Sequence, residues 1–354
     1  MKTDISKLVR SNIANLQPYS SARDEYSGSS ALLLDANENP YNSPYNRYPD
    51  PHQTDLKKKI GKIKGIDASN IFIGNGSDEA IDLLYRIFCE PGKDNVVSIS
   101  PSYGMFKVCA DINQVEMRTV PLNNDFSLDT QGLKEAVDAH TKMLFLCSPN
   151  NPTSNSFSPE EILSLVSDLN LIVVLDEAYI DFSQRKSLKE EISNHNNIVV
   201  LQTFSKAWGL AGIRLGIALA DQEIISLMTK VKYPYNMNML TLNFALEALN
   251  NEAEKNEWIS VILSEREELE RKLKMYRFVE KVYPSDANFL LVKVRKPIKV
   301  YTFLVEKKII VRDRSSVELC EGCLRITVGS KDDNYLLTEA LMHYQRDFVE
   351  PCDL

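Results

Sequence analysis

Short apolar segments alternate with helical patterns over the first two-thirds of the chain. The helical patterns place apolar residues three or four positions apart, whereas the intervening segments are apolar at nearly every position. Strands that are apolar on both faces are typical of a parallel sheet covered by helices. We expect such strands over residues 70–73, 95–100, 115–120, 142–147, 171–175 and 197–202. The pattern therefore predicts an α/β fold with a large, mostly parallel sheet.

The pattern changes after about residue 235. A long charged helical stretch over 252–276 is followed by apolar segments over 288–294, 309–312 and 323–328. We interpret this region as a smaller α/β domain. No flexible Gly/Ser linker separates the two parts, so we expect them to pack closely around a ligand cleft.

Capping signals predict where two helices of the larger part begin. Thr54 can cap a helix that Gly65 ends. Residues 158–161, Ser-Pro-Glu-Glu, combine an N-cap serine, a first-turn proline and a capping-box glutamate. We expect helices to start at both places.

Charge and composition exclude some classes of protein. The chain has 41 basic and 49 acidic residues in 354, a net charge of −8, which disfavours a general nucleic-acid binder. Its start lacks the apolar core of a secretory signal, and no apolar run is long enough to span a bilayer. We therefore expect a cytoplasmic protein with no membrane partner.

Metal-binding patterns are weak. The six cysteines are scattered, apart from Cys320 and Cys323, and a single CxxC is poor evidence for zinc. These two cysteines more simply frame a turn at Glu321-Gly322. The four histidines show no ligand spacing, so we expect no metal site.

Lys206 lies in a loop whose composition suits chemistry. On residue type alone, a solvated loop lysine is the commoner interpretation. Hydroxyl groups, two glycines and Arg214 surround it, however, and such groups suit a phosphate dianion. A lysine that is partly desolvated among cations has a lowered pKa and can condense with an aldehyde.

Asp176 follows the apolar segment 171–175, at the sheet edge where α/β proteins bind ligands. A buried carboxylate is costly unless a cation pairs with it, and a protonated pyridine nitrogen would be such a cation. A turn-capping role is the alternative. One strand–helix–strand unit separates Asp176 from Lys206, so the two can meet above neighbouring strands. Together they suggest a pyridinium aldehyde cofactor.

The segment Gly74-Asn75-Gly76-Ser77-Asp78-Glu79 opens a helix directly after a strand. Such a helix start presents free N–H groups and a positive dipole end to an anion. The spacing is not that of a dinucleotide or Walker loop, and plain helix capping is an alternative.

In order and spacing, these segments resemble the fold type I pyridoxal-phosphate enzymes, and among them the histidinol-phosphate aminotransferases. The resemblance extends over nearly the whole chain. It is carried by residues 35–40, 47–50, 74–79, 101–104, 148–153, 176–179, 203–214, 310–313 and 324–327. Two departures are Ser154, where the family usually has glycine, and Ile217, where an aromatic residue is common.

The resemblance implies roles around pyridoxal 5'-phosphate. It makes Lys206 the Schiff-base lysine and proton shuttle, and Asp176 the partner of the pyridine nitrogen. Tyr103 corresponds to the residue stacked on the ring, and Asn151 and Tyr179 to donors to its phenolic oxygen. For each of the last three, ordinary packing or turn formation is the alternative.

The resemblance also implies how anions are held. The phosphate of the cofactor would be bound by Ser77, Asp78, Thr203, Ser205 and Arg214, with Tyr48 reaching it from a second subunit of a homodimer. The substrate would be bound by Arg325, as the anchor of its anionic end, and by Arg312, Tyr19 and Asn37. For Arg312, a surface ion pair with a nearby carboxylate is the alternative.

The implied domains are an N-terminal arm over 1–40 contributing to the small domain and the dimer, a large cofactor-binding domain over 41–240, and a small domain over 241–354. The implied reaction is ping-pong transamination in histidine biosynthesis, in which histidinol phosphate and 2-oxoglutarate yield imidazole acetol phosphate and glutamate. Alternatives are a threonine-phosphate decarboxylase, an aromatic amino-acid aminotransferase or a non-catalytic effector-binding sensor.

Overall fold

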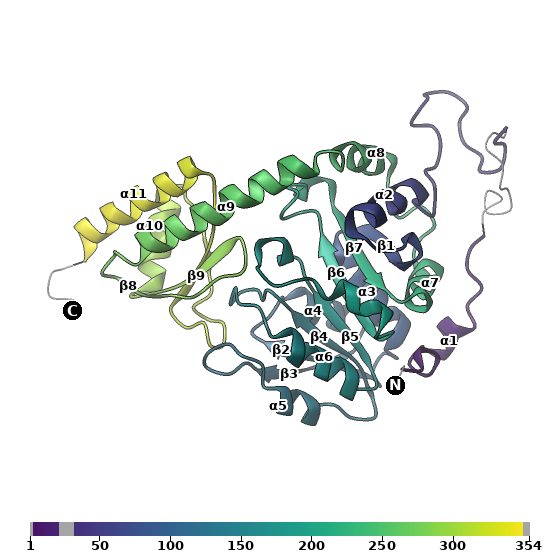
Figure 1. Ribbon diagram of the computed structural model, residues 1–354, viewed down its shortest axis with the longest axis horizontal. Coiled ribbons are helices and arrows are strands. Elements are labelled where there is room, and N and C mark those ends of the chain that lie inside the picture. Colours follow the sequence, from purple (N-terminus) through teal and green to yellow (C-terminus); the bar gives the residue numbers. More distant parts are fainter. Residues whose placement is uncertain (1–2, 21–31, 350–354) are drawn as a thin grey trace.

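The computed structural model describes residues 3–20 and 32–349. Within these residues the strands form one seven-stranded and one four-stranded sheet (Figure 1). The larger sheet has the order β1-β7-β6-β5-β4-β2-β3. Its strands are β1 (Ile71–Asn75), β2 (Asn95–Ser100), β3 (Glu116–Pro121), β4 (Thr141–Cys147), β5 (Ile172–Asp176), β6 (Ile198–Thr203) and β7 (Leu215–Ala220). Six of the seven were predicted, each within two residues at either end.

The larger sheet is parallel except for β7, which runs antiparallel to both β1 and β6. The sequence analysis missed β7. Its segment Leu-Gly-Ile-Ala-Leu-Ala contains small residues that have low strand propensity. Gly216 is required by a close approach, because a Cβ there would lie 2.1 Å from the backbone N of Ser77. The small residue lets β7 pass directly beside the start of helix α3.

Helices cover both faces of this sheet. The side chains of β5 show the division, since Val173 and Leu175 pack into one core cluster and Ile172 and Val174 into another. The first cluster includes side chains from helices α2 (Thr54–Lys64), α5 (Thr130–Glu135), α6 (Pro159–Asp168) and α8 (Met239–Ala248). The second cluster includes side chains from α3 (Ser77–Phe88), α4 (Met105–Ile112) and α7 (Gln222–Val231). The predicted α/β layering is confirmed.

The two predicted helix starts had different outcomes. Ser158 caps α6 by accepting a bond from the Glu161 amide, as expected. The helix predicted at Thr54 is present and ends before Gly65 as expected, but the capping role predicted for Thr54 was wrong, because Gln53 is the cap residue and Thr54 is already helical. The Thr54 amide donates instead to Asp50 Oδ2 over 2.7 Å, so the carboxylate takes the position expected of the threonine hydroxyl.

The smaller sheet has the order β10-β11-β9-β8 and is antiparallel throughout. Its strands are β8 (Val279–Val282), β9 (Phe289–Val294), β10 (Arg312–Asp313) and β11 (Cys323–Thr327). One face packs against α9 (Glu252–Leu273), α10 (Pro297–Glu306) and α11 (Lys331–Phe348). The sequence analysis missed β8, a short strand whose middle residues Glu280 and Lys281 are exposed.

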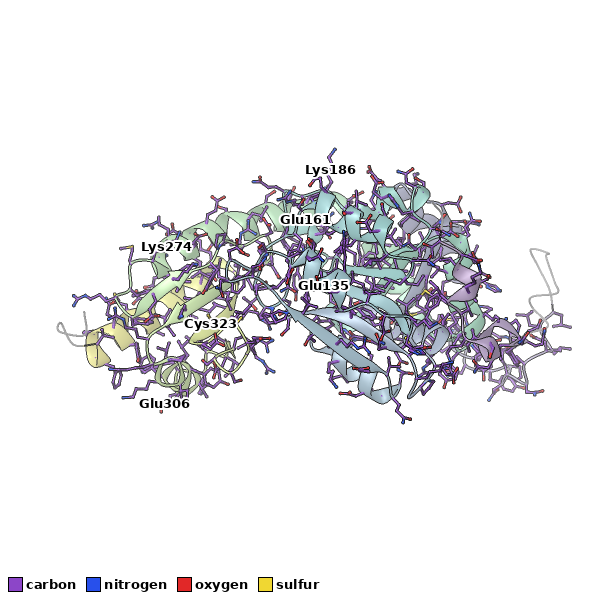
Figure 2. All side chains as sticks on the ribbon, turned by 90° about the horizontal axis from the view of Figure 1, so that it is seen from below. Glu135, Glu161, Lys186, Lys274, Glu306 and Cys323 are labelled. Atoms are coloured by element: carbon purple, nitrogen blue, oxygen red, sulfur yellow. The ribbon has the colours of Figure 1, made fainter. Side chains whose placement is uncertain are left out.

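The other face of the smaller sheet turns toward the larger part. Leu291, Cys320 and Cys323 belong to the core cluster that contains the side chains of β5. The two cysteines are fully buried on either side of the predicted Glu321-Gly322 turn, in which Gly322 has φ 78°. In Figure 2, Cys323 lies between Lys274 and Glu306, which are exposed on the outside of the small-sheet part. The two parts therefore share a core.

The N-terminal residues pack beside the larger sheet. Ile5, Leu8 and Ile13, from η1 (Ile5–Lys7) and α1 (Ser11–Ala14), join the core cluster of α3 and α7. Figure 1 places this end far from the smaller sheet. The division of the chain at residues 40 and 240 stays a prediction.

The close approach at Gly216 leads to a stability prediction. In Gly216→Ala the new Cβ must displace the start of α3, and we expect a loss of about 1–3 kcal/mol in the free energy of unfolding. Gly104→Ala is the matched control, because its Cβ meets nothing within 4 Å and the change should stay within about 0.5 kcal/mol. Urea unfolding monitored by circular dichroism would measure both, and equal stabilities would contradict the proposed packing.

Candidate functional site

A pocket opens at the carboxyl ends of the central strands of the larger sheet. It is lined by Gly76, Ser77, Asp78, Tyr103, Cys147, Asn151, Asp176, Ala178, Tyr179, Thr203, Ser205, Lys206, Ala211 and Arg214. Ten of these positions were singled out from the sequence. They come together because parallel strands end at the same sheet edge, so residues far apart in the chain become neighbours.

One end of the pocket has the donors that an anion needs. Helix α3 begins after Gly76, which has φ 76° and provides no side-chain cap, so the first amides of the helix stay available. Arg214 lies beside this start, since a Cβ on Gly76 would be 2.6 Å from its Nη2. Ser77 and Ser205 add hydroxyl groups. This donor set fits a phosphate group.

Asp78 and Thr203 have structural contacts at the same end. Asp78 Oδ1 accepts from the Tyr103 hydroxyl over 3.0 Å, and its Oδ2 lies 3.4 Å from Arg214 Nη2. Thr203 Oγ1 accepts from the Ser205 amide over 3.1 Å, which holds the loop after β6 against its strand. These contacts orient the arginine and the tyrosine toward the pocket.

Asp176 is the last residue of β5 and is only 2 % exposed. Its Oδ1 accepts a single hydrogen bond, from the Ala178 amide over 2.9 Å, and no basic side chain within the described residues pairs with it. Burial raises the pKa of this carboxyl to about 7, against the opposing effects of the Ala178 amide and Lys206. A cationic donor in the pocket would therefore be bound tightly here.

Lys206 lies across the pocket on the loop after β6. Its Nζ is 5.7 Å from the centroid of the Tyr179 ring. The Lys206 residue as a whole is exposed, but protein atoms around its amine exclude water and so lower the pKa of the amine. The positive charges of Arg325 and Arg214 lower this pKa further. A lysine with a lowered pKa supplies a neutral amine more readily, which suits a nucleophile and a base.

Three further pocket residues are held by neighbours. The Tyr103 ring packs edge-on against Phe106, with centroids 5.6 Å apart. Tyr179 is 8 % exposed, and burial raises the pKa of its hydroxyl. Asn151 is buried, and its Oδ1 accepts a 2.5 Å bond from Arg325 Nη1. This last bond joins the larger part to strand β11 of the smaller sheet.

The predicted substrate arginines lie beside the pocket. Arg325 is half-buried on β11, with its guanidinium 5.4 Å above the Phe289 ring. Arg312 is its directly opposed partner on β10 and is exposed. The alternative for Arg312 was a surface ion pair with a nearby carboxylate. In the described part of the chain, neither Asp313 nor Glu318 forms an ion pair with Arg312.

Tyr19, Asn37 and Tyr48 do not line the pocket. Tyr19 is 71 % exposed and borders a separate cavity, and Asn37 is exposed with φ 54°. Tyr48 stacks on Tyr235 with centroids 4.4 Å apart. Their assigned roles stay predictions. The sequence analysis also missed Arg314, which follows Arg312 by two residues, just past the end of β10.

Two searches of the described residues bear on other functions. Within the described ranges, residues 3–20 and 32–349, no helix is long and apolar enough to cross a bilayer. Within the same ranges, no three His, Cys, Asp or Glu side chains are grouped as a metal site would require.

Comparison with known proteins decides the family. The model of the aminotransferase class I and II family matches residues 26–341. The chain belongs to this family. A histidinol-phosphate aminotransferase from Parabacteroides distasonis is 55% identical over 338 residues, which cover 96% of this chain and 98% of the relative. Within the family, the chain is thus one of the histidinol-phosphate aminotransferases, as the sequence indicated.

Solved structures of relatives have the same fold. The histidinol-phosphate aminotransferase of Sinorhizobium meliloti, solved with pyridoxal-5'-phosphate, is 27% identical with a TM-score of 0.78, covering 85% of this chain and 83% of that one. The enzyme from Clostridium acetobutylicum is 22% identical with a TM-score of 0.79, covering 85% and 91%. The second likeness concerns the fold alone.

The raised pKa of Asp176 predicts a pH effect on the cofactor-free protein. The folded protein holds this proton more tightly than the unfolded chain, so the stabilising contribution is full below about pH 4 and is lost as the pH rises through about 7. Asparagine does not titrate, so the Asp176→Asn variant does not lose stability in this way as the pH rises. Its free energy of unfolding should therefore rise relative to wild type between about pH 5 and pH 8 in urea titrations. A constant difference would show that Asp176 is already ionised at pH 5.

Proposed function

We propose that this chain is a pyridoxal-phosphate-dependent enzyme that transfers the amino group of histidinol phosphate to 2-oxoglutarate. The products would be imidazole acetol phosphate and glutamate, in histidine biosynthesis. The observation that carries the proposal is the buried, unpaired Asp176 carboxylate facing the same pocket as Lys206 and an anion-binding helix start. The 55% identity to a histidinol-phosphate aminotransferase supports the substrate.

The pocket residues would hold the cofactor at both of its ends. The first amides of α3 at Ser77 and Asp78, the Thr203 and Ser205 hydroxyls and Arg214 would bind its phosphate. Asp176 would pair with the ring nitrogen. When bound, the cofactor supplies an electron sink that stabilises negative charge developing on the substrate Cα.

Three other residues would orient the ring. Tyr103 would stack on it, and the Asn151 amide and Tyr179 hydroxyl would donate to its phenolic oxygen. Asn151 suits this role because Arg325 donates to its Oδ1, which leaves the amide nitrogen free to turn toward the pocket. Lys206 would attach to the cofactor aldehyde between turnovers.

Lys206 would also carry the catalytic proton. Its lowered pKa leaves more of the amine neutral near pH 7, so it can accept the proton from the substrate Cα and return it. Arg214 and Arg325 favour that neutral state by charge repulsion. A cationic partner would favour the ionised form of the buried Asp176 carboxyl, so Asp176 would hold the ring nitrogen protonated during this transfer.

Arg325 would anchor the anionic end of each substrate. Its planar guanidinium can bind a carboxylate or a phosphate with two parallel hydrogen bonds, which suits an enzyme that accepts both. Arg312, beside it on β10, would add charge. Tyr19, Asn37 and Tyr48 lie outside the pocket in one chain, and we propose that a second copy in a homodimer brings Tyr48 and Tyr19 to it.

The direct test is glutamate formation from histidinol phosphate and 2-oxoglutarate. Lys206→Ala should lower the rate by about 10²- to 10⁴-fold or more, because the proton carrier is lost. Borohydride should no longer fix pyridoxal phosphate to that variant. Lys186→Ala, an exposed lysine elsewhere on the larger part, is the matched control and should behave as wild type (Figure 2). A Lys206→Ala variant that still fixes the cofactor would refute the assignment.

The same assay separates the alternatives. Release of carbon dioxide from threonine phosphate, without glutamate formation, would favour a threonine-phosphate decarboxylase. Faster transamination of aromatic amino acids than of histidinol phosphate would favour an aromatic amino-acid aminotransferase.

A further inference from the structure

Three arginines lie on one face of the smaller sheet. Arg312 on β10 is directly opposite Arg325 on β11, so their side chains share a face. The Arg314 amide donates to the Cys323 carbonyl over 2.9 Å, which continues the ladder past the end of β10. Because side chains alternate along a strand, Arg314 lies on the same face as Arg312.

This face is the one that turns toward the pocket. Cys323, opposite Arg314, and Leu291, opposite Arg325, both pack into the core cluster of the larger sheet. Leu324 and Ile326, which point the other way from β11, pack instead beneath the helices of the smaller part. Arg314 and the pocket residue Tyr179 also influence each other electrostatically.

The three guanidinium groups lack acidic partners. Within the described residues, none of them forms an ion pair with a carboxylate, and Arg314 Nε is buried without a hydrogen-bond partner. The nearest acidic groups along the chain are occupied elsewhere, since Asp313 accepts from Ser315 and Glu318 from Ser100. Burial, and then the charges of Arg325 and Arg312, lower the pKa of Arg314.

Such an arrangement is costly unless an anion binds to it. Buried positive charge without a counter-ion destabilises a protein, and a buried N–H donor without an acceptor adds to that cost. A carboxylate can be satisfied by the fork of Arg325 alone. A phosphate dianion has three terminal oxygens and a second charge, so it can accept from further guanidinium groups at the same time.

We propose that Arg314 is a specificity-determining residue that binds the substrate phosphate and favours the phosphorylated amine over the carboxylate-bearing amino donor. This inference rests on the proposed transamination. In this proposal Arg325 binds the anionic end of both substrates, whereas Arg314 binds only the phosphorylated one. The unsatisfied Nε of Arg314 is the donor that the phosphate would use.

The test compares the two half-reactions in the cofactor-loaded enzyme. Arg314→Gln should lower kcat/KM for histidinol phosphate roughly 10- to 100-fold, the effect of losing one charge-assisted hydrogen bond. kcat/KM for glutamate should change less than about threefold, since that substrate does not need the group. Arg277→Gln, an equal charge change at an exposed position of the smaller part, is the control and should alter neither.

Inorganic phosphate supplies a readout that does not depend on turnover. Calorimetric titration of the loaded enzyme with phosphate should show weaker binding in Arg314→Gln, and partial recovery in Arg314→Lys, which keeps the charge but not the fork. Wild-type absorbance of the bound cofactor and an unchanged melting temperature would establish that the variants are folded. If Arg314→Gln does not fold, Arg314→Lys carries the same comparison alone.

Two outcomes would overturn the inference. One is an equal loss for both substrates, which would make Arg314 a general structural residue, and the other is no loss for either. If the wild-type enzyme itself fails to transaminate histidinol phosphate while still binding phosphate through Arg314, the proposed function fails and the anion site stands.

Discussion

Burial of the Asp176 carboxylate is the constraint around which the pocket is built. The residue ends a central strand with one hydrogen bond and 2 % exposure, so its charge is costly unless a cation arrives. Within the described residues no basic side chain pairs with it directly, although Lys206 and Arg214 line the same pocket. The pocket thus has positive charge at the end with Arg214 and a carboxyl that can ionise, Asp176, at the other. A phosphorylated pyridinium requires this arrangement.

The second constraint is the contact between the two sheets. Arg325 reaches from β11 to Asn151, and Ser154 strengthens the same junction. Ser154 has φ 67°, a conformation that favours the glycine usual in the family, and its carbonyl accepts from the Asp286 amide over 2.8 Å. This hydrogen bond joins the loop of Asn151 to the segment before β9.

Much of the fold and most of the pocket were predictable from the sequence because continuous apolar runs mark buried parallel strands, and the polar residues that follow them mark one sheet edge. Asp176 and Lys206 were found in this way, whereas Tyr103, Asn151 and Tyr179 were predicted only from the family resemblance. Strand β7 was missed because its small residues serve a close approach to α3, which depends on tertiary contacts. Arg314 was missed because β10 has only two residues, too few for alternation to be seen. The role that the family resemblance implies for Tyr48 requires a second subunit, which one sequence does not place.

The protonation state of the bound cofactor tests the central claim most directly. Pyridoxal phosphate labelled with ¹⁵N in its ring can be loaded into the wild-type protein and into Asp176→Asn, and the nitrogen chemical shift measured at neutral pH. The account predicts a protonated ring nitrogen in wild type and an unprotonated one in the variant, because only the carboxylate compensates the ring charge. An unprotonated nitrogen in the wild-type protein would contradict it.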